Sequence, residues 1–314
     1  MKPWLSVILP VHNGSAYLGA TLASAAALSP SGVEFRVYNS GDDGGRARSV
    51  TEPFADLLDL VWHDTPQIKP WTAKTNLGVR EARADHVVML HQDDLWLHGH
   101  LNAVRMAIDA YPQAVMSIAP SRFVAHDGRL VGPWRLPFAA GLHPGAAMID
   151  ALLVQNSIAI PSPVIRRDAW LEAGGMDEAL WYTADWDLYL KLARAGPVAV
   201  RYEATTAFRI HGGSLTMAGR SDGVAFRKQL EIVLDRHLAQ SASPRWRTIE
   251  ARARASISVN CALAAASAGE PQFVWRAALD LLRLGPSGLV GYLRQSRIID
   301  RVRPRLRLQL AGGL

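Results

Sequence analysis

The sequence predicts an α/β fold with a mostly parallel central sheet flanked by helices and followed by a C-terminal helical extension. Short apolar runs alternate with segments of helical periodicity through the first half of the 314-residue chain, which is typical of βαβ units. Polar clusters directly follow three of these runs, at residues 10–13, 39–43 and 91–94. Because ligands of such sheets bind beyond the carboxyl ends of the strands, the clusters predict a binding site there.

Strands are expected where β-branched and long apolar residues run together, and helices where apolar residues recur at helical spacing. The first strand, in residues 5–11, is buried on both faces and stopped by a proline. Further strands are expected at 34–38, 60–62, 86–90, 198–200 and 207–210, and helices at 17–27, 46–58, 72–84, 97–111, 148–154, 169–173 and 185–195. Residues 127–145, rich in Gly, Pro and Trp, are expected to form a long loop such as a lid.

After about Ser214 the pattern becomes mostly helical, which predicts a binding and catalytic domain at 1–215 and a basic helical region at 216–314. The net charge of +6 and the pI near 9.7 favour anionic partners. Residues 281–310 mix leucine, isoleucine and arginine as an interfacial helix would. Two interpretations stay open for this segment: packing on the catalytic domain, and peripheral contact with a membrane.

Several classes of protein are disfavoured by composition. The single cysteine, Cys261, excludes an internal disulfide and a Cys-based zinc site. No apolar run approaches the roughly 18–20 residues that span a bilayer, and no export leader precedes the first strand. We therefore expect a cytoplasmic protein, and peripheral contact with the inner face of the membrane stays open. The basic tail has few interleaved aromatic residues, which does not favour nucleic-acid binding.

Two adjacent carboxylates, Asp93 and Asp94, follow the buried strand expected at 86–90. Adjacent carboxylates repel each other unless a cation or hydrogen-bond donors compensate, and Mg²⁺ or Mn²⁺ bound by one or two carboxylates completes its shell with substrate phosphates and water. The alternative is that the pair caps the helix expected from Leu97. Its position after a buried strand favours the metal.

Two further clusters contain groups suited to catalysis. Asp185 and Asp187 lie two residues apart, so on a helix they point in different directions, and one of them can face a cleft as a general base. The alternative is that both acids only belong to the first turn of a helix. His211 follows a strand and precedes glycines, where an imidazole suits Mn²⁺ and similar ions, and Arg209 is placed to meet phosphates.

In chain order, five segments resemble motifs of the family-two glycosyltransferases with the GT-A fold. Residues 7–13 resemble the opening strand motif, and residues 74–78 resemble the Ala-Arg-Asn-x-Gly segment. Residues 90–94 resemble the Asp-x-Asp metal motif with its following acid. Residues 174–178 and 184–188 together resemble the segments that carry the base, and residues 209–214 resemble the closing Arg-x-His-x-x-Ser motif. The resemblance covers about residues 5–216. It implies a Rossmann-like GT-A domain that transfers a sugar, with inversion, from a UDP-, GDP- or dTDP-sugar to an acceptor hydroxyl on a glycan, a lipid-linked molecule or a small molecule.

The same resemblance implies a role for individual residues. Asp185 would be the general base, Asp93 would bind Mn²⁺ or Mg²⁺ on the donor diphosphate, and His211 would be a further metal or diphosphate ligand. The implied donor-binding residues are Pro10, Val11, His12, Asn13, Asn39, Lys74, Asn76, Gln92, Asp94 and Arg209.

The chain departs from the family pattern at three positions. Asn39 stands where an aspartate is common, His91 replaces the first acid of the metal motif, and Ala184 replaces the glutamate of the base motif. Two alternatives are kept: a nucleotidyltransferase, although residues 11–15 are not a Gly-rich basic loop, and a non-catalytic protein that binds anions or nucleic acid through the basic tail. Neither a P-loop nor a Gly-x-Ser-x-Gly segment is present.

Overall fold

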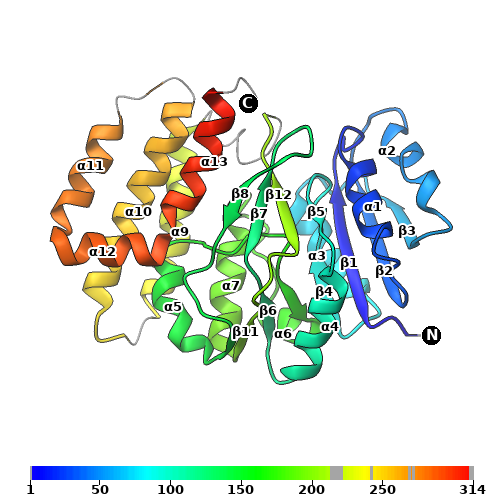
Figure 1. Cartoon of the computed structure of the whole chain (residues 1–314), viewed down its shortest axis with the longest axis horizontal. Coiled ribbons are helices and arrows are strands. Elements are labelled where there is room, and N and C mark those ends of the chain that lie inside the picture. The colour runs from blue at the N-terminus through cyan, green and yellow to red at the C-terminus, as the bar shows by residue number, and fades with distance from the viewer. Residues whose placement is uncertain (1, 213–221, 241–242, 268–269, 271–272, 311–314) are drawn as a thin grey trace.

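A central eight-stranded sheet, with strand order β3-β2-β1-β4-β10-β6-β11-β9, organises the computed structural model of the chain (Figure 1). The structure describes residues 2–212, 222–240, 243–267, 270 and 273–310. The strands are β1 (Leu5–Val11), β2 (Val33–Asn39), β3 (Asp59–Asp64), β4 (His86–Met89), β6 (Met116–Ile118), β9 (Gly141–His143), β10 (Val164–Arg166) and β11 (Val198–Val200). The first four are mutually parallel, whereas β10 runs antiparallel between β4 and β6. The predicted α/β class is confirmed, with an antiparallel insertion that the sequence did not indicate.

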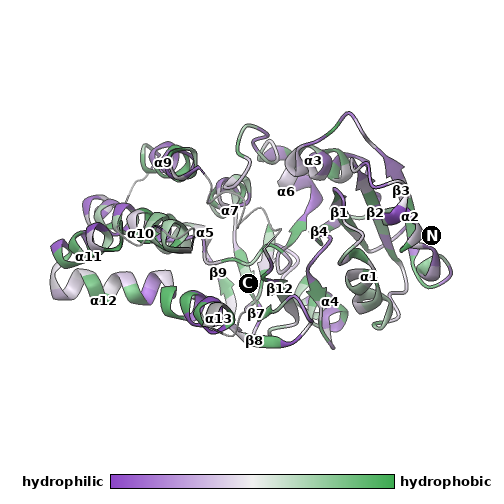
Figure 2. Ribbon diagram, turned by 90° about the horizontal axis from the view of Figure 1, so that it is seen from above, coloured by the Kyte–Doolittle hydropathy of each residue, from purple (hydrophilic) through white to green (hydrophobic). Residues whose placement is uncertain are grey.

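Helices cover both faces of this sheet. They are α1 (Leu18–Ala26), α2 (Arg46–Ser49), α3 (Trp71–Glu81), α4 (His100–Ala110), α5 (Gly145–Val154), α6 (Arg167–Glu172) and α7 (Ala184–Ala195). Figure 2 shows α3, α6 and α7 on one face and α1 and α4 on the other. All seven residues of β1 are buried, as expected for a strand that is covered on both faces.

A second, four-stranded sheet lies beside the carboxyl end of β4, with the order β5-β12-β7-β8. Its strands are β5 (Leu95–Trp96), β7 (Ser121–Val124), β8 (Leu130–Trp134) and β12 (Thr206–Arg209). The prediction of a long loop at 127–145 is therefore wrong, since β8 and β9 both fall within it. Long-range pairing decides the conformation here: β8 pairs with β7, and the Trp134 ring stacks on Phe123 with 5.0 Å between centroids.

Two other predicted elements are shorter than the sequence pattern indicated. The helix expected at 46–58 ends at Ser49 and is followed by a single 3-10 turn at Glu52–Phe54. A proline in the first turn of that 3-10 segment cannot donate to the preceding helix. The helix expected from Leu97 begins at His100, after Gly99 in the left-handed region.

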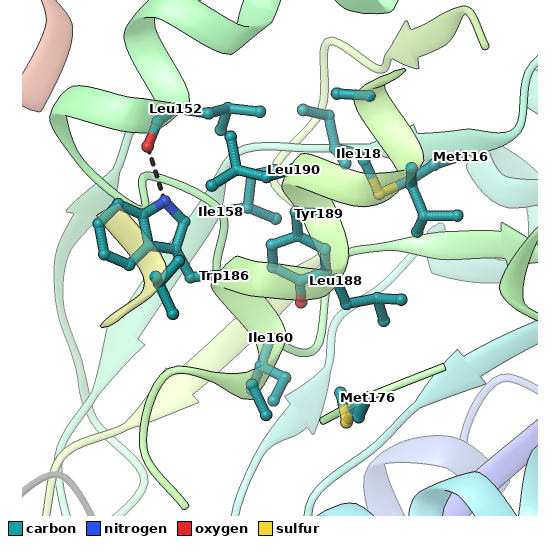
Figure 3. Packing of buried hydrophobic residues seen from close by; sticks show 14 of the residues in the cluster. Met116, Ile118, Leu152, Ile158, Ile160, Met176, Trp186, Leu188, Tyr189 and Leu190 are labelled. Carbon is teal, nitrogen blue, oxygen red and sulfur yellow. Dashed lines mark hydrogen bonds between the residues drawn. The ribbon is translucent and has the colours of Figure 1, made fainter. Parts of the chain in front are cut away.

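The C-terminal helices share the core of the sheet. They are α9 (Gly223–Leu238), α10 (Trp246–Ser267), α11 (Val274–Arg283), α12 (Gly285–Ser296) and α13 (Ile298–Leu310). One hydrophobic cluster joins Ile8 of β1 and Tyr189 of α7 to Leu230 of α9 and Tyr292 of α12. Figure 3 shows part of it, with the Trp186 indole of α7 donating to the Leu152 carbonyl of α5 at 2.7 Å.

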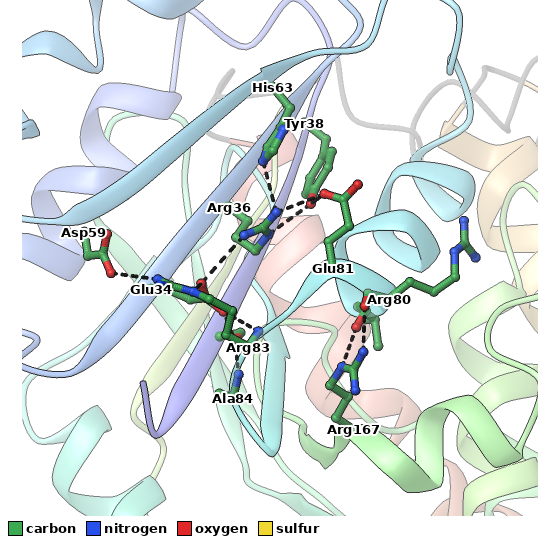
Figure 4. Close-up of polar contacts among 12 residues, drawn as sticks. Glu34, Arg36, Tyr38, Asp59, His63, Arg80, Glu81, Arg83, Ala84 and Arg167 are labelled. Atoms are coloured by element: carbon green, nitrogen blue, oxygen red, sulfur yellow. Dashed lines mark hydrogen bonds and ion pairs between the residues drawn. The ribbon is translucent and has the colours of Figure 1, made fainter. Parts of the chain in front are cut away.

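A buried ion network holds α3 and the following turn against β2 and β3 (Figure 4). Glu34 is fully buried and accepts hydrogen bonds from Ser6 Oγ, from the Arg83 amide at 2.7 Å and from Arg83 Nε at 2.6 Å. Burial alone would raise the pKa of Glu34, but the bonds from Ser6 and Arg83 lower it below its usual value. The network fixes α3, whose residues line the cavity described next.

Among the described residues, no helix is long and apolar enough to cross a membrane.

Candidate active site

A cavity of about 600 Å³ opens beyond the carboxyl ends of β1 and β4. Two groups of residues line it. The first group follows these strands or lies on α3 and the loop before it: Pro10, His12, Lys69, Trp71, Lys74, His91, Gln92 and Asp93. The second group comes from the small sheet, α7, the C-terminal helices and the segments that follow α5 and precede α7. It includes Trp134, Asn156, Glu178, Trp181, Asp185, Phe208, Arg301 and Arg305. The cavity therefore joins the predicted strand-end site to parts of the chain that the strand-end argument does not reach.

A possible metal centre lies at the end of β4. One ligand atom from each of His91, Asp93 and Asp94 lies within 4.8 Å of the others. His211 Nε2 comes within 2.8 Å of Asp93 Oδ2. Within the described part of the chain, His91 Nε2 and Asp94 Oδ2 are buried and have no hydrogen-bond partner. Burial lowers the pKa of His91, so its ring is neutral at pH 7 and able to ligate.

This donor set of imidazole nitrogen and carboxylate oxygen suits a divalent ion such as Mn²⁺. The alternative interpretation of Asp93 and Asp94 as helix caps is wrong, because α4 begins at His100 with Gly99 as its N-cap and no side-chain cap. The sequence identified His91 only as a departure from a motif. In the structure His91 belongs to the same cluster as the two aspartates.

Asp94 and Arg209 lie beneath the cavity and are not among the residues that line it. Asp94 is 1% exposed, and its Oδ1 accepts a hydrogen bond from the Arg209 amide at 3.0 Å. Arg209 Nε donates to the Asp93 carbonyl at 2.7 Å, and its Nη1 donates to the Ala125 carbonyl at 2.9 Å. Burial and the neighbouring Asp93 raise the pKa of Asp94 well above its usual value. These contacts tie the segment that carries Asp93 to β12 and β7.

Of the other predicted donor residues, Pro10, His12, Gln92 and Lys74 line the cavity. The Gln92 amide pairs with the His12 backbone, with Oε1 accepting from its N–H at 2.8 Å and Nε2 donating to its carbonyl at 3.2 Å. Lys74 Nζ donates to the Val11 carbonyl at 2.6 Å and to Ser40 Oγ at 2.8 Å. Burial, with a smaller effect from Lys69, lowers the pKa of Lys74 to about 8, so its amine still carries a proton at pH 7.

Val11, Asn13, Asn39 and Asn76 do not line the cavity but shape its wall. Asn13 has a φ of 51°, and its Oδ1 accepts from the Asp42 amide at 3.1 Å, while Asn39 Oδ1 accepts from the Gly41 amide at 3.0 Å.

Asn76 bridges α3 to the segment before α7. Its Nδ2 donates to the Met176 carbonyl at 2.9 Å and to Glu178 Oε1 at 3.0 Å, and its Oδ1 accepts from the Met176 amide at 2.9 Å. In the structure it therefore positions Glu178, which itself lines the cavity.

Asp185 and Asp187 occupy contrasting environments at the start of α7. Asp185 lines the cavity, and its Oδ2 accepts a hydrogen bond from Asn156 Nδ2 at 2.9 Å. Burial raises the pKa of Asp185 to about 6, against the lowering effect of Asn156. The Asp187 side chain is fully buried, accepts hydrogen bonds from Arg236 at 2.9 Å and His237 at 2.8 Å, and forms an ion pair with Lys191 at 2.6 Å. Burial alone would raise the pKa of Asp187, but these partners lower it.

The two acids thus point in different directions, as their spacing on a helix predicts. A carboxyl group whose pKa lies near neutrality can accept a proton from a hydroxyl and later release it, which is the requirement for a general base. Sequence reasoning missed Asn156 and Arg301, which flank Asp185 and belong to no motif. Ser214, the last residue of the closing motif, lies outside the described residues.

Comparison with known proteins identifies relatives over most of this framework. Residues 6–172, more than half of the chain, match the family model described as "Glycosyl transferase family 2". An uncharacterized glycosyltransferase of Rickettsia typhi is 22% identical over 226 residues, which cover 68% of this chain and 66% of that protein. An uncharacterized glycosyltransferase of Haemophilus influenzae is 24% identical over 192 residues, or 60% of this chain and 61% of that protein. The matched stretch thus spans less than two thirds of the length of these relatives.

Solved structures of low sequence identity share the fold. Residues 1–349 of TarS from S. aureus, in complex with UDP-GlcNAc, superpose with a TM-score of 0.62 at 15% identity, covering 94% of this chain and 90% of that one. The mannosyltransferase PcManGT from Pyrobaculum calidifontis, in complex with GDP-Man and Mn²⁺, gives a TM-score of 0.55 at 18% identity, covering 98% and 87%. These similarities confirm the predicted GT-A fold.

Proposed function

The chain belongs to glycosyltransferase family 2, and on that premise we propose that it transfers a sugar from a nucleoside diphosphate donor to an acceptor hydroxyl with inversion. One observation carries the proposal. Asp185, whose pKa is raised to about 6, lines the same cavity as His91, Asp93 and His211. A base for the acceptor and a cluster suited to a metal–diphosphate complex are the two parts that such a displacement needs.

We place the donor at the end of the cavity that follows β1 and β4. Lys69 and Lys74 bring positive charge to this end, and the His12–Gln92 pair forms a polar wall beside them. TarS in complex with UDP-GlcNAc and PcManGT in complex with GDP-Man show that proteins of this fold bind nucleotide sugars. Both donor classes stay open for this chain, and a dTDP-sugar also satisfies the same charge requirement.

Asp93 is the proposed anchor for Mn²⁺ or Mg²⁺, with His91 and His211 as further ligands. The bound ion would supply positive charge for the departing nucleoside diphosphate. Asp94 and Arg209 act from beneath, since their hydrogen bonds fix the backbone that carries Asp93. PcManGT in complex with Mn²⁺ supports a metal in this fold.

Asp185 is the proposed general base. At pH 7 a carboxyl group with a pKa of about 6 is about nine-tenths ionised, so it is ready to take the proton of the acceptor hydroxyl. Asn156 Nδ2 donates to Asp185 Oδ2 and holds the carboxylate in place at the cavity wall. The protonated group then returns its proton to water.

The test is a screen of UDP-, GDP- and dTDP-sugars that measures nucleoside diphosphate release with and without Mn²⁺ or Mg²⁺. Asp185→Asn and Asp93→Asn should each lose most of the activity, whereas Asp109→Asn, an exposed acid on α4, should keep it. Absence of binding and turnover for every donor would refute the function. The nucleotidyltransferase alternative and the non-catalytic alternative are not supported, because the matched family is one of glycosyltransferases.

We also propose the division into a GT-A domain at 1–215 and a helical region at 216–314, whose boundary falls among residues outside the described part of the chain. Contact of the helical region with anionic lipid is a further part of the proposal. The interfacial segment expected at 281–310 is not one helix but the end of α11, α12 and α13.

The exposed apolar face lies on α11, at the edge of the molecule away from β1 (Figure 1). Trp275, Leu279 and Leu282 are 57%, 42% and 71% exposed at helical spacing, with Arg276 and Arg283 beside them. The double substitution Trp275→Ser with Leu282→Ser should abolish binding to phosphatidylglycerol vesicles while nucleoside diphosphate release from free donor persists. Equal binding of the wild-type chain to phosphatidylcholine vesicles would contradict an electrostatic contact.

A further inference from the structure

Two arginines of the last helix reach into the active-site cavity. Arg301 and Arg305 lie one turn apart on α13 and both line the cavity. The Arg301 guanidinium lies 5.1 Å from the centroid of the Trp134 ring, and that of Arg305 lies 5.2 Å from the Phe123 ring. Stacking of this kind fixes the plane of a guanidinium while its N–H groups stay available at the edge.

The position of α13 is set by close packing against β8. A Cβ added at Gly132 would come within 2.7 Å of Pro304 Cγ, so the helix approaches the strand closely at a residue without a side chain. Pro304 is itself buried between the two arginines. The helix is therefore docked in a defined register, which directs Arg301 and Arg305 toward the cavity.

Arg301 lacks the carboxylate partners that two other arginines of the helical region have. Arg236 pairs with Asp177 and Asp187, and Arg254 pairs with Asp235 and Glu250. Among the residues that the structure describes, no carboxylate oxygen lies within ion-pair distance of Arg301.

The acid next to Arg301 in the chain does not compensate it either, because Asp300 is engaged by Arg135 at 2.8 Å. Burial lowers the pKa of Arg301, against smaller raising effects of Tyr182, Tyr292 and the Asp185 carboxylate. Arg301 thus has one hydrogen bond to a carbonyl and a longer-range interaction with Asp185, and a desolvated cation of this kind is stabilised by an anion in direct contact.

That anion would lie beside the base. Arg301 Nη1 donates to the Asn156 carbonyl at 3.2 Å, and the side chain of the same Asn156 holds Asp185 Oδ2. One residue thus links Arg301 to Asp185. The donor end of the cavity has cations of its own, Lys69 and Lys74, so the arginines are not needed for the donor diphosphate.

We infer that Arg301 and Arg305 form an anion subsite for the acceptor, which carries a phosphate or carboxylate group close to the hydroxyl that Asp185 deprotonates. The inference rests on the proposed function, because it assigns the acceptor end of the same site. A guanidinium can donate two parallel hydrogen bonds to the two oxygens of a carboxylate or to two oxygens of a phosphate. The second arginine, one turn along the helix, can contact a further oxygen of the same group.

The test uses glycerol 1-phosphate as a probe that carries both hydroxyl and phosphate, with glycerol as the neutral comparison. Binding is measured by calorimetry on the full chain, first alone and then saturated with Mn²⁺ and the tightest-binding of UDP, GDP and dTDP. We expect the phosphate probe to bind in both states and glycerol in neither. Arg301→Gln should weaken probe binding at least about tenfold, since a charge-assisted pair is lost, and should leave the nucleotide dissociation constant within about twofold.

Two further variants guard against misfolding as the cause. Arg303→Gln changes an exposed arginine of the same helix and should leave probe binding unchanged. Arg301→Lys keeps the positive charge but loses the planar guanidinium that can donate two parallel hydrogen bonds. Its affinity for glycerol 1-phosphate should therefore fall between those of the wild type and Arg301→Gln. The inference is overturned if Arg301→Gln weakens nucleotide instead of probe, if bound nucleotide abolishes probe binding, or if glycerol binds as well as its phosphate. Failure of all three nucleotides to bind would instead refute the proposed function, because probe binding to the chain alone is measured separately.

Discussion

Replacing Asp185 by Asn should remove the base while preserving the shape of the site. The amide has nearly the same volume as the carboxyl group, and its oxygen can still accept the hydrogen bond from Asn156 Nδ2. Positioned general bases contribute about 10²–10⁴-fold to the rate. We therefore expect kcat for sugar transfer to fall by that factor, with the KM for the donor little changed, because donor and base occupy different ends of the cavity.

The pH dependence of the wild-type enzyme gives an independent measure of the same residue. Burial raises the pKa of Asp185 from 3.8 to about 6, so the ionised fraction falls from about nine-tenths at pH 7 to about one-tenth at pH 5. The rate should therefore drop about tenfold between these pH values. A base with an ordinary carboxyl pKa would lose almost nothing over this range, which separates the two cases clearly.

The assay is steady-state release of nucleoside diphosphate at several pH values, with unfolding by urea measured on the same samples. Asp185→Asn should be at least as stable as the wild type at pH 8, because it removes a desolvated charge. Asp109→Asn is the matched control: it changes an exposed acid of α4, so it should keep the wild-type rate and an acid limb near pH 6. Full activity in Asp185→Asn, or an acid limb near pH 4 in the wild type, would refute the assignment.

Three other changes test the metal centre and the framework. Asp93→Asn should weaken Mn²⁺ binding at least about tenfold, measured from free Mn²⁺ by electron paramagnetic resonance, and unchanged affinity would exclude Asp93 as the anchor. Asp187→Asn should cost about 1–3 kcal/mol of unfolding free energy at pH 7, because the partly exposed Arg236 and Lys191 lose the charge of a fully buried carboxylate. The pKa of Asp187 is lowered in the folded state, so its contribution is complete above the ordinary carboxyl range and fades as pH falls; the cost in urea titrations should shrink toward acid pH. Gly78→Ala should cost about 1–3 kcal/mol, since the new Cβ would lie 2.5 Å from Ile8 Cγ2 and 2.8 Å from Tyr38 Cε2; unchanged stability would show that β1 and β2 can shift.

Sequence reasoning succeeded where local chemistry sets the structure. Apolar runs locate the parallel strands, and the polar residues at their ends, such as His12 and Asp93, meet in one cavity because parallel strands end at the same edge. The helical spacing of Asp185 and Asp187 was sufficient to predict their different directions. In each case the deciding interaction lies within a few residues of the side chain concerned.

The missed features depend on contacts between distant parts of the chain. Asp94 turns beneath the cavity because the backbone amide of Arg209, 115 residues later, donates a hydrogen bond to its carboxylate. Residues 130–134 form a strand because β7 offers a partner and Phe123 stacks on Trp134. Neither fact has a local signature, because the Gly-, Pro- and Trp-rich composition of 127–145 suits a loop equally well.

The helical region is a structural part of the active site rather than an appendage to it. Arg236 and His237 of α9 hold Asp187 on α7, two residues from the proposed base, so they fix the helix that presents Asp185. Arg301 of α13 closes the opposite wall through Asn156. Without α9, Asp187 would lose its ion pair with Arg236 and its hydrogen bond from the neutral His237 ring, so its carboxylate would be less well compensated. The proposed acceptor end of the site therefore depends on the packing of α9 and α13, whereas the proposed donor end depends on β1, β4 and α3.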